Sequence, residues 1–156
     1  MTISPASAYL SSINILHQEF VHKQKISSIE EAAEQRNQSV NQIIRSILFR
    51  LEKDKFVMIL VAGKIQIDWK KLRNYFKTSR LTTASPEEVF NITGFRVGSV
   101  GPFGLKNDID IYYDDGINSN SSISIGSGVR GTGIMMTTEN LIKALGNNKN
   151  TSDFTK

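Results

Sequence analysis

The sequence predicts a single α+β domain in which helices surround a mixed or barrel-like β-sheet. Its length of 156 residues is usual for one domain. Hydrophobic residues make up 39% and charged residues 22%, which is an ordinary globular balance. Segments with strand character alternate irregularly with helix start signals, without the strict order that indicates a doubly wound parallel sheet. Together these observations favour the α+β class.

The first third of the chain predicts three helices and one short strand. Apolar residues near helical spacing indicate a helix over residues 4–17. A short strand is expected over residues 20–26. Ser/Glu capping boxes predict a helix over residues 28–35, and a Ser-x-x-Gln box predicts another short helix at residues 39–42.

The middle of the chain predicts a β-hairpin followed by two helices. Apolar runs at residues 46–51 and 56–62 flank a short charged turn, which is the pattern of a hairpin. An aspartate precedes the basic segment 69–77 and is a suitable helix N-cap. A strand is expected at residues 80–83. The sequence Ser-Pro-Glu-Glu then starts a helix over residues 85–94, which ends at a glycine.

The last third predicts a glycine-rich loop, three strands and a helix. In chain order these segments are residues 98–104, 108–113, 122–125, 133–136 and 137–146. The domain is expected to cover residues 1–146, because residues 147–156 are polar and predict a disordered tail.

Composition excludes several classes of protein. The chain has no cysteine, so it forms no disulfide, thiolate metal site or cysteine nucleophile. His17 and His22 are five residues apart and would not share one helical face, so no histidine metal site is predicted, and no cofactor motif is found. Asp108, Asp110 and Asp114 alternate in a strand-like stretch, where a solvated strand end and an oxygen-only magnesium site are the two interpretations, and no cation-loop pattern is present. Residues 1–10 lack the pattern of a signal peptide, and the longest apolar run is too short to span a membrane. We therefore expect a cytoplasmic protein with no membrane partner.

Residues 126–131 match the spacing G-x-G-x-x-G of dinucleotide-binding proteins. That motif must open a helix, whereas the residues that follow it in this chain predict a strand. We interpret this segment as a glycine-rich turn between strands.

Positive charge is concentrated in the first half of the chain. Residues 1–80 hold 13 Lys and Arg against 7 Asp and Glu, a net +6, whereas residues 81–156 hold 6 against 8, a net −2. A basic half is typical of proteins that bind polyanions, although a solvated surface accounts for it equally well. The candidate phosphate-binding residues are Lys70, Lys71, Arg73 and Lys77.

Residues 93–104 contain four glycines and one proline in twelve positions. Glycines let a backbone approach a ligand closely, and the exposed N–H groups can bind an oxyanion or a carbonyl oxygen. A purely structural turn that carries a phenylalanine is the other interpretation, and the residues alone leave both open.

This glycine-rich segment resembles a block of the YbaK/EbsC family, which includes prolyl-tRNA editing domains. Further segments resemble the family in the same order. They are residues 28–34, 42–49, 56–63, 68–72, 84–89, 112–114 and 125–128. The resemblance covers about residues 20–146 and rests on the ordered set rather than on one motif.

The resemblance implies a YbaK-like domain that hydrolyses the ester of mischarged tRNA without a side-chain nucleophile. The backbone of residues 98–102 would hold the substrate carbonyl, and a hydroxyl of the tRNA would position water. The implied catalytic residues are Arg45, Gly98, Gly101 and Pro102. The implied substrate-binding residues are Ser46, Gly63, Phe103, Gly104, Asp114, Gly126, Ser127 and Gly128. The partners implied are the acceptor end of mischarged tRNA and an aminoacyl-tRNA synthetase.

Arg45 departs from the family, which generally has a lysine at this position. An arginine keeps its proton and so cannot act as a general base, but it can bind phosphate or carboxylate as a planar fork. A surface salt bridge to Glu30 or Glu34 is its structural alternative. The departure keeps a second function open, in which a non-catalytic relative binds tRNA, a nucleotide or a protein through the same pocket. An unrelated hydrolase would need a nucleophile that the sequence does not offer.

Overall fold

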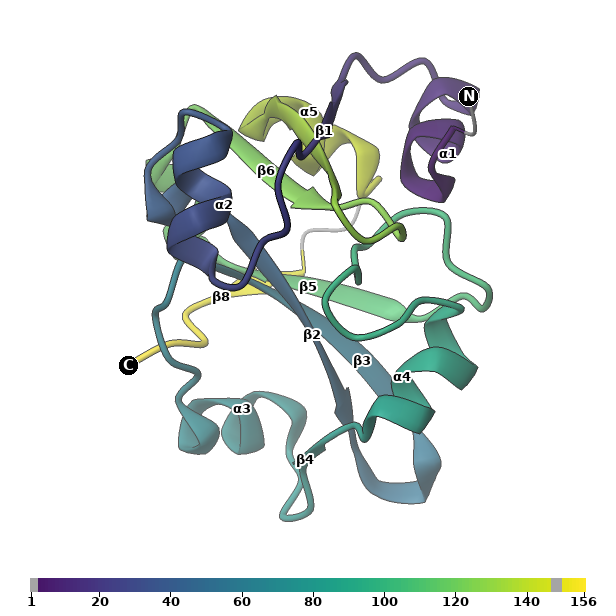
Figure 1. Ribbon diagram of the computed structural model, residues 1–156. Helices are drawn as coiled ribbons and strands as arrows, with labels where there is room; N and C mark the ends of the chain where they lie inside the picture. Colours follow the sequence, from purple (N-terminus) through teal and green to yellow (C-terminus); the bar gives the residue numbers. More distant parts are fainter. Residues whose placement is uncertain (1–2, 147–149) are drawn as a thin grey trace.

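Two sheets and five α-helices make up the described part of the chain, which is residues 3–146 and 150–156 of this computed structural model (Figure 1). In chain order the elements are α1 (Pro5–Ser12), β1 (Gln18–Val21), α2 (Ile29–Gln35), a 3-10 turn (Val40–Gln42), β2 (Ile44–Arg50), β3 (Phe56–Ala62), α3 (Trp69–Phe76), β4 (Thr82–Thr83), α4 (Pro86–Thr93), β5 (Asp110–Asp114), β6 (Ser122–Gly126), β7 (Thr132–Thr137), α5 (Thr138–Ala144) and β8 (Thr151–Ser152).

The larger sheet has the strand order β4-β2-β3-β5-β8, and the smaller sheet has the order β1-β7-β6. β2 and β3 form the predicted antiparallel hairpin, whereas β5 runs parallel to β3. The larger sheet is therefore mixed, which confirms the predicted α+β class. Neither sheet closes into a barrel among the described strands. A single bridge between Ile43 and Ser124 links the two sheets.

β4 covers only one end of β2. It pairs with Phe49 and Arg50, and the Ala84 N–H extends this contact by one hydrogen bond of 2.9 Å to the Leu48 carbonyl. In the described structure, residues 45–47 of β2 are paired with β3 and have no partner strand on their other side. This open edge is the part of the sheet that faces the site described below.

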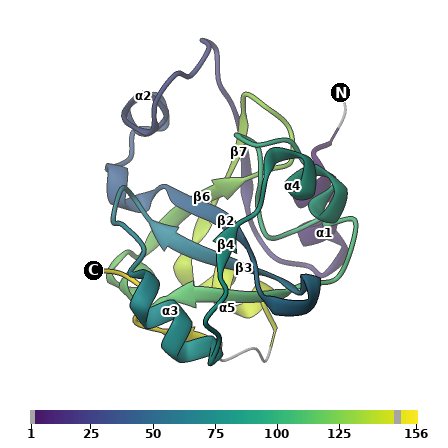
Figure 2. The same ribbon diagram turned by 90° about the horizontal axis from the view of Figure 1, so that it is seen from below.

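β3 lies between two hydrophobic cores, because both of its faces are covered. Val57, Ile59 and Val61 belong to a core shared with α3, whereas Met58 and Leu60 belong to the larger core shared with β6, β7 and α5. A strand buried on both faces is continuously apolar, and this one is. In both views α3 lies away from α1 and α4 (Figures 1 and 2).

The helices begin where the capping residues predict. The Ser28 hydroxyl accepts a hydrogen bond of 3.1 Å from the Glu31 N–H at the start of α2. Ser85 and Glu88 form the reciprocal capping box of α4, with bonds of 2.9 and 3.1 Å. Asp68 caps α3. None of the described helices is both long enough and apolar enough to cross a membrane.

Two boundaries near the N-terminus differ from those predicted. α1 ends before His17, because Asn14 adopts a left-handed backbone with φ of 59° that the helix cannot continue through. The strand predicted at residues 20–26 lies earlier, at β1. Its last residue, Val21, pairs with Thr132, the first residue of β7, so the ladder has no partner beyond that point.

The prediction of a disordered tail is wrong for residues 150–156, while residues 147–149 lie outside the described residues. Thr151 belongs to β8, which pairs parallel with β5. Phe154 is fully buried in the core beneath α3. The segment is mostly polar, but a single buried aromatic side chain removes a large apolar area from water and outweighs that composition.

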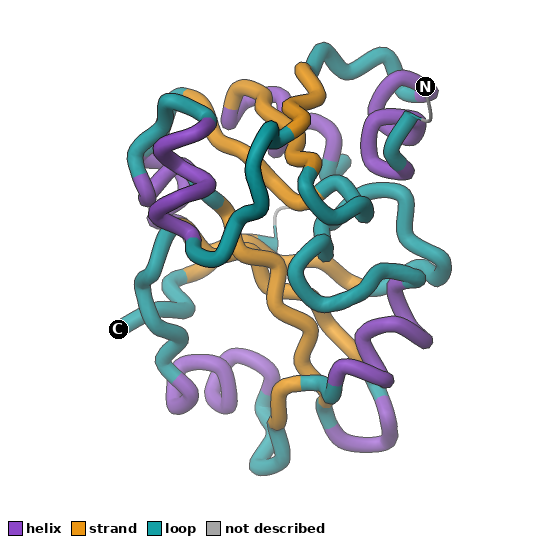
Figure 3. Tube along the Cα trace, in the orientation of Figure 1, coloured by secondary structure: helices purple, strands orange, loops and turns teal. Residues whose placement is uncertain are grey.

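The glycine-rich segment belongs to the long irregular connection between α4 and β5, drawn in teal in Figure 3. It begins at Gly94, which ends α4 with a left-handed φ of 81°. The Lys106 N–H donates to the Thr93 carbonyl at 3.0 Å and closes the loop back on its own start. The connection is therefore a folded loop of fixed shape, and its central residues face the site.

Candidate functional site

A cavity of about 910 Å³ opens between α2, the open edge of β2, the glycine-rich loop and the β6–β7 turn. Its apolar lining includes Ile29, Ile43, Ile44, Leu48, Val89, Val100 and Ile125. Its basic lining consists of Lys25, Arg36, Arg45 and Arg130.

The charge of this cavity has one sign. Four basic side chains line it, and no aspartate or glutamate is among its lining residues in the described structure. A cavity with low-dielectric walls and charge of one sign concentrates ligands of the opposite sign. The apolar floor provides a second requirement, because it favours a ligand with an uncharged part that can leave water. The arrangement suits an anionic ligand with an apolar group.

Four of the predicted site residues line this cavity: Arg45, Ser46, Gly98 and Gly126. They come from three elements that are distant in sequence, which are β2, the glycine-rich loop and the end of β6. The structure thus brings together predicted residues from three of the segments that the sequence singled out. Their roles in binding or catalysis remain predictions.

Gly98 is the glycine of the loop that faces open space. Its φ of 98° is a backbone conformation that favours glycine, and a Cβ at this position would meet no atom within 4 Å. Among the described residues, the N–H groups of Gly98 and Val100 donate to no protein acceptor, whereas the neighbouring Ser99 N–H donates to the Arg96 carbonyl at 3.0 Å. The two free donors are available to a carbonyl oxygen or an oxyanion in the cavity.

Gly101 and Gly126 serve a different purpose. A Cβ on Gly101 would lie 2.8 Å from the Gly126 carbonyl carbon, and a Cβ on Gly126 would lie 2.7 Å from that of Val100. The Gly128 N–H also donates to the Ser99 carbonyl at 2.8 Å. These glycines allow two backbones of the protein to touch, so the loop is held against the end of β6.

The residues after Gly101 point away from the cavity toward α1. Pro102 and Phe103 are buried, and the Phe103 ring stacks on Tyr9 with centroids 5.7 Å apart. A Cβ on Gly104 would lie 2.6 Å from the Pro5 carbonyl. None of these three predicted residues lines the cavity, and their contacts fix the loop on the N-terminal helix.

Arg45 is held by the backbone rather than by a carboxylate. Its Nε donates to the Gly63 carbonyl at 2.6 Å, and its Nη2 donates to the Ile65 carbonyl. Burial lowers the pKa of this guanidinium. The salt bridge considered with Glu30 is not formed, because Glu30 pairs with Lys64 at 2.7 Å. Arg45 therefore secures the turn after β3 while lining the cavity.

Ser46 offers an unused hydroxyl beside the open strand edge. It lies two residues from both Ile44 and Leu48 along β2, so it faces the same side of the sheet as these two residues of the larger core. Its Oγ is buried and has no hydrogen-bond partner in the described structure. A buried polar group normally finds a partner, so this hydroxyl is an unsatisfied group in the wall of the cavity.

The remaining predicted substrate-binding residues do not line the cavity. Gly63 is buried beside Asn41 at the end of β3. The Ser127 hydroxyl donates to the Thr132 carbonyl at 2.9 Å inside the β6–β7 turn. Gly128 packs against the ring of Phe95.

Asp114 is buried at the end of β5, which β3 separates from β2 and the cavity. It accepts hydrogen bonds from the N–H groups of Gly116, at 3.0 Å, and Phe154, at 2.8 Å. These contacts give it a structural role in the present fold, where it fixes the C-terminal segment on β5.

The predicted phosphate-binding residues lie on α3 and at its C-terminal end, on the far side of the larger sheet from the cavity floor. Lys71 is already engaged, since its Nζ contacts the Asp153 carboxylate at 2.7 Å and the Thr155 carbonyl at 2.6 Å. Lys70, Arg73 and Lys77 are exposed. These three remain candidates for contacts with a long polyanion but do not line the cavity.

Sequence reasoning missed three basic cavity residues: Lys25, Arg36 and Arg130. Two of them flank the predicted helix over residues 28–35, and the third lies inside a motif that was interpreted as structural. Lys25 precedes the capping serines of α2, Arg36 follows the helix, and Arg130 stands inside the turn interpreted as structural. The signal that could have found them is the accumulation of basic residues at element ends beside those motifs.

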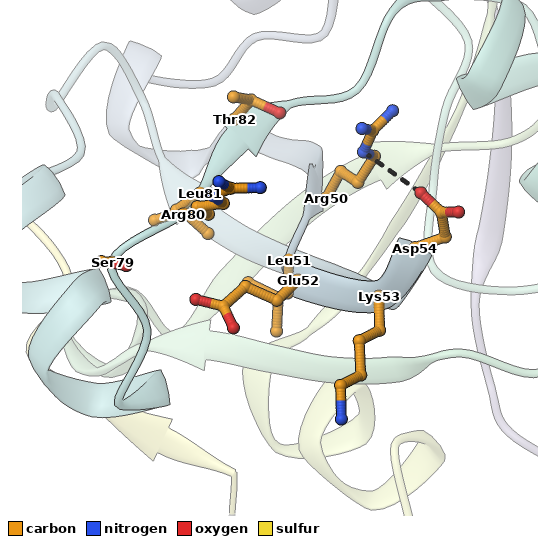
Figure 4. A pocket seen from close by; sticks show the side chains of 9 residues that line it. All are labelled: Arg50, Leu51, Glu52, Lys53, Asp54, Ser79, Arg80, Leu81 and Thr82. Atoms are coloured by element: carbon orange, nitrogen blue, oxygen red, sulfur yellow. Dashed lines mark ion pairs between the residues drawn. The ribbon is translucent and has the colours of Figure 1, made fainter.

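A second hollow, of about 550 Å³, lies at the other end of β2 beside the hairpin turn (Figure 4). In its lining Arg50 contacts Asp54 at 3.5 Å, and Arg50 also pairs with Glu88 at 3.1 Å. Basic and acidic side chains both line this hollow, so its charge is not of one sign. It contains none of the predicted site residues, and the larger cavity is the better candidate.

The sequence of this chain is similar to a family model and to several known proteins. A family model for the aminoacyl-tRNA editing domain matches residues 23–144. An uncharacterized protein of Bacillus subtilis, YwhH, is 35% identical over 115 residues, which are 74% of this chain and 73% of that protein. The proline--tRNA ligase of Thermosipho melanesiensis is 31% identical over 108 residues, or 69% of this chain. This chain spans only 19% of the ligase.

The fold is also shared with solved structures. One, described as the "Crystal structure of a putative trans-editing enzyme for prolyl tRNA synthetase", matches with a TM-score of 0.88 and 24% identity over 97% of this chain and 95% of the other. A hypothetical protein, APE2540, matches with a TM-score of 0.88 at 16% identity. The family model covers most of the chain and includes every residue of the cavity lining. The chain therefore belongs to the aminoacyl-tRNA editing domain family.

Proposed function

We propose that this protein is an aminoacyl-tRNA deacylase that acts in trans on the ester between an incorrect amino acid and the 3′ end of a tRNA. Several relatives are named as proline--tRNA ligases, and this chain corresponds to about a fifth of their length. That relationship makes tRNA for proline the first substrate to test and a proline--tRNA ligase the first candidate protein partner.

The observation that carries this proposal is the cavity with four basic side chains, no carboxylate among its described lining residues and an apolar floor. The end of an aminoacyl-tRNA has matching chemistry. Its phosphates are anionic, whereas its terminal base and many amino acid side chains are partly or wholly apolar. Arginine and lysine are the residues that contact nucleic acid phosphates most often.

In this proposal the glycine-rich loop holds the ester carbonyl. The free N–H groups of Gly98 and Val100 would donate to its oxygen and stabilise the negative charge that develops there when water attacks. The Ser46 hydroxyl, which has no partner in the described structure, would donate to the substrate after rotating toward the cavity. No lining residue in the described structure is a carboxylate, histidine or cysteine, so a hydroxyl of the tRNA would position the water.

Arg45 supports a second candidate, a non-catalytic protein that binds tRNA or a nucleotide in the same cavity. Its guanidinium is bound to two backbone carbonyls and keeps its proton. A cavity with donors but no acid or base suits binding as well as hydrolysis that relies on the substrate. The two candidates differ in a single measurable respect, which is turnover.

The deciding experiment measures release of labelled amino acid from a panel of mischarged tRNAs, starting with tRNA for proline. The loop is tested with Gly98→Ala, which should reduce the rate at least about tenfold by placing a methyl group beside the free donors. Gly146→Ala is the matched control, because Gly146 also has a positive φ, of 83°, and no atom within 4 Å, but lies outside the cavity.

Hydrolysis that is lost in Gly98→Ala and kept in Gly146→Ala would support the deacylase. If wild-type protein binds the acceptor end but releases no amino acid from any member of the panel, the non-catalytic candidate replaces it.

A further inference from the structure

Arg36 is a partly buried cation that three other elements hold in place. It follows α2, and its Nε donates to Nε2 of His22 at 2.9 Å. Its Nη1 donates to the Ser124 hydroxyl on β6 at 2.8 Å. Gly133 on β7 makes room for it, because a Cβ there would lie 2.6 Å from Nη2. The guanidinium therefore has one orientation, and it lines the cavity.

His22 acts as an acceptor for Arg36 because of its own second contact. Its Nδ1 lies 2.8 Å from Oε1 of Gln35, an oxygen that can only accept. The proton of the neutral ring is therefore on Nδ1, which leaves Nε2 free to accept from Arg36. Burial lowers the pKa of His22, the hydrogen bond to Gln35 opposes this effect, and the nearby Arg36 charge adds to it, so the pKa is lowered and the neutral ring is favoured.

Within residues 3–146 and 150–156, no carboxylate pairs with the charge of Arg36. None of the ion pairs among the described residues includes it, and burial lowers the pKa of its guanidinium with no opposing charge. Its partners, a neutral imidazole and a hydroxyl, bring no negative charge. Buried charges in proteins are normally paired. A fixed, unbalanced cation in the wall of an open cavity is the expected form of an anion-binding residue.

We propose that Arg36 binds the phosphate that joins the last two nucleotides of an RNA 3′ end, and so anchors the terminal nucleoside in the cavity. The proposal rests on the proposed function, in that it assigns one group of the same substrate. With Nε and Nη1 already donating to His22 and Ser124, the guanidinium keeps its charge and its Nη2 for a phosphate oxygen, and a charge-assisted hydrogen bond of this kind is a strong one. Its Nη2 donates to no acceptor in the described structure, and Lys25 and Arg130 add positive charge from the cavity lining.

Direct binding measurements test this assignment without relying on catalysis. The probes are adenosine and the dinucleotide cytidylyl-(3′→5′)-adenosine, which adds the phosphodiester. Calorimetry gives the ratio of the two dissociation constants for each protein. We expect wild type to favour the dinucleotide by about tenfold or more, as a charge-assisted hydrogen bond would provide.

Two variants test the proposed contact between the Arg36 guanidinium and the phosphate in different ways. Arg36→Gln removes the charge, whereas Gly133→Ala keeps it but displaces the guanidinium with a methyl group. Each should lower the dinucleotide preference at least about fivefold and leave adenosine affinity nearly unchanged. Arg80→Gln, which removes an arginine from the second hollow, is the control and should keep the wild-type ratio.

The assignment is overturned if wild type binds both probes equally, or if the variant proteins that fold keep the wild-type ratio. Should Arg36→Gln fail to fold, Gly133→Ala decides alone. A wild type that shows the phosphate preference but deacylates no tRNA would leave this assignment standing and refute only the proposed hydrolysis.

Discussion

Replacing Gly101 by alanine tests whether the glycine-rich loop is shaped by the protein or by its ligand. The new Cβ would lie 2.8 Å from the Gly126 carbonyl carbon, and real Cβ atoms essentially never come within 3.0 Å of such an atom. The obstacle is backbone, so a rotamer change cannot relieve it. The loop must move away from β6, which also strains the hydrogen bond between Gly128 and Ser99.

The size of the effect follows from these two contacts. Overpacking of a buried position costs about 1–3 kcal/mol, and loss of the neighbouring hydrogen bond adds about 0.5–1.5 kcal/mol. We therefore expect Gly101→Ala to lower the free energy of unfolding by about 2–4 kcal/mol, which corresponds to about 5–15 °C in Tm for a domain of this size.

The assay is thermal and urea unfolding followed by circular dichroism, with Gly98→Ala as the comparison. Gly98→Ala meets no nearby atom and should lose only about 1–2 kcal/mol through its left-handed backbone. If Gly101→Ala unfolds at the wild-type temperature but no longer binds or hydrolyses substrate, then Gly101 contacts the ligand, and its role in packing the loop against β6 is refuted.

Three further predictions test other parts of the structure. Phe154→Ala should lower the free energy of unfolding by about 3–5 kcal/mol, measured by urea titration, because its ring is fully buried; a change below about 1 kcal/mol would mean that the last residues do not complete the core. The folded-state pKa of His22 lies below its usual value, so the unfolded chain binds this proton more readily than the folded one. The neutral His22 therefore contributes to the free energy of unfolding in full above about pH 6.5, and this contribution should be lost as the pH falls through the folded pKa. His22→Gln should flatten this dependence in unfolding experiments between about pH 8 and pH 5, and an identical slope would exclude His22 as its source. For tRNA binding, Arg130→Gln should reduce the slope of log affinity against log salt by about 0.7, whereas Lys70→Gln on α3 should reduce it less; the reverse order would move the phosphate contacts to α3.

Local signals in the sequence were sufficient for most of the fold. Helix starts at Ser28, Asp68 and Ser85 followed from capping chemistry, which involves only neighbouring residues. The continuous apolar run of β3 predicted a buried strand at the correct residues. The order of strands depends on contacts between distant segments, and short-range patterns carry no information on it. Phe154 illustrates this limit, because its burial depends on β5 and α3.

The candidate site was predictable only in part for the same reason. The glycine-rich loop and Arg45 stood out through their residue types, and both reach the cavity. Glycine is ambiguous, however, because it serves close approach to a ligand and close packing of two backbones alike. Gly98 and Gly101 look equivalent in the sequence, and only the position of Gly126 distinguishes them. Arg36 could not be identified from the sequence, because it is distinguished by having no ion pair among the described residues, and that property depends on the fold.

The open edge of β2 also bears on the solubility of this fold. Unpaired strand edges are places where another chain can add a strand, and proteins usually protect them against such aggregation. In this fold β4 blocks one end of the edge at Phe49, while residues 45–47 lie in the wall of a cavity beside α2 and the glycine-rich loop. A recessed edge flanked by Arg36 and Arg45 is a poor template for a flat, extended strand. The same peptide groups that would be a liability on a convex surface can thus remain unpaired and available to a small, charged ligand.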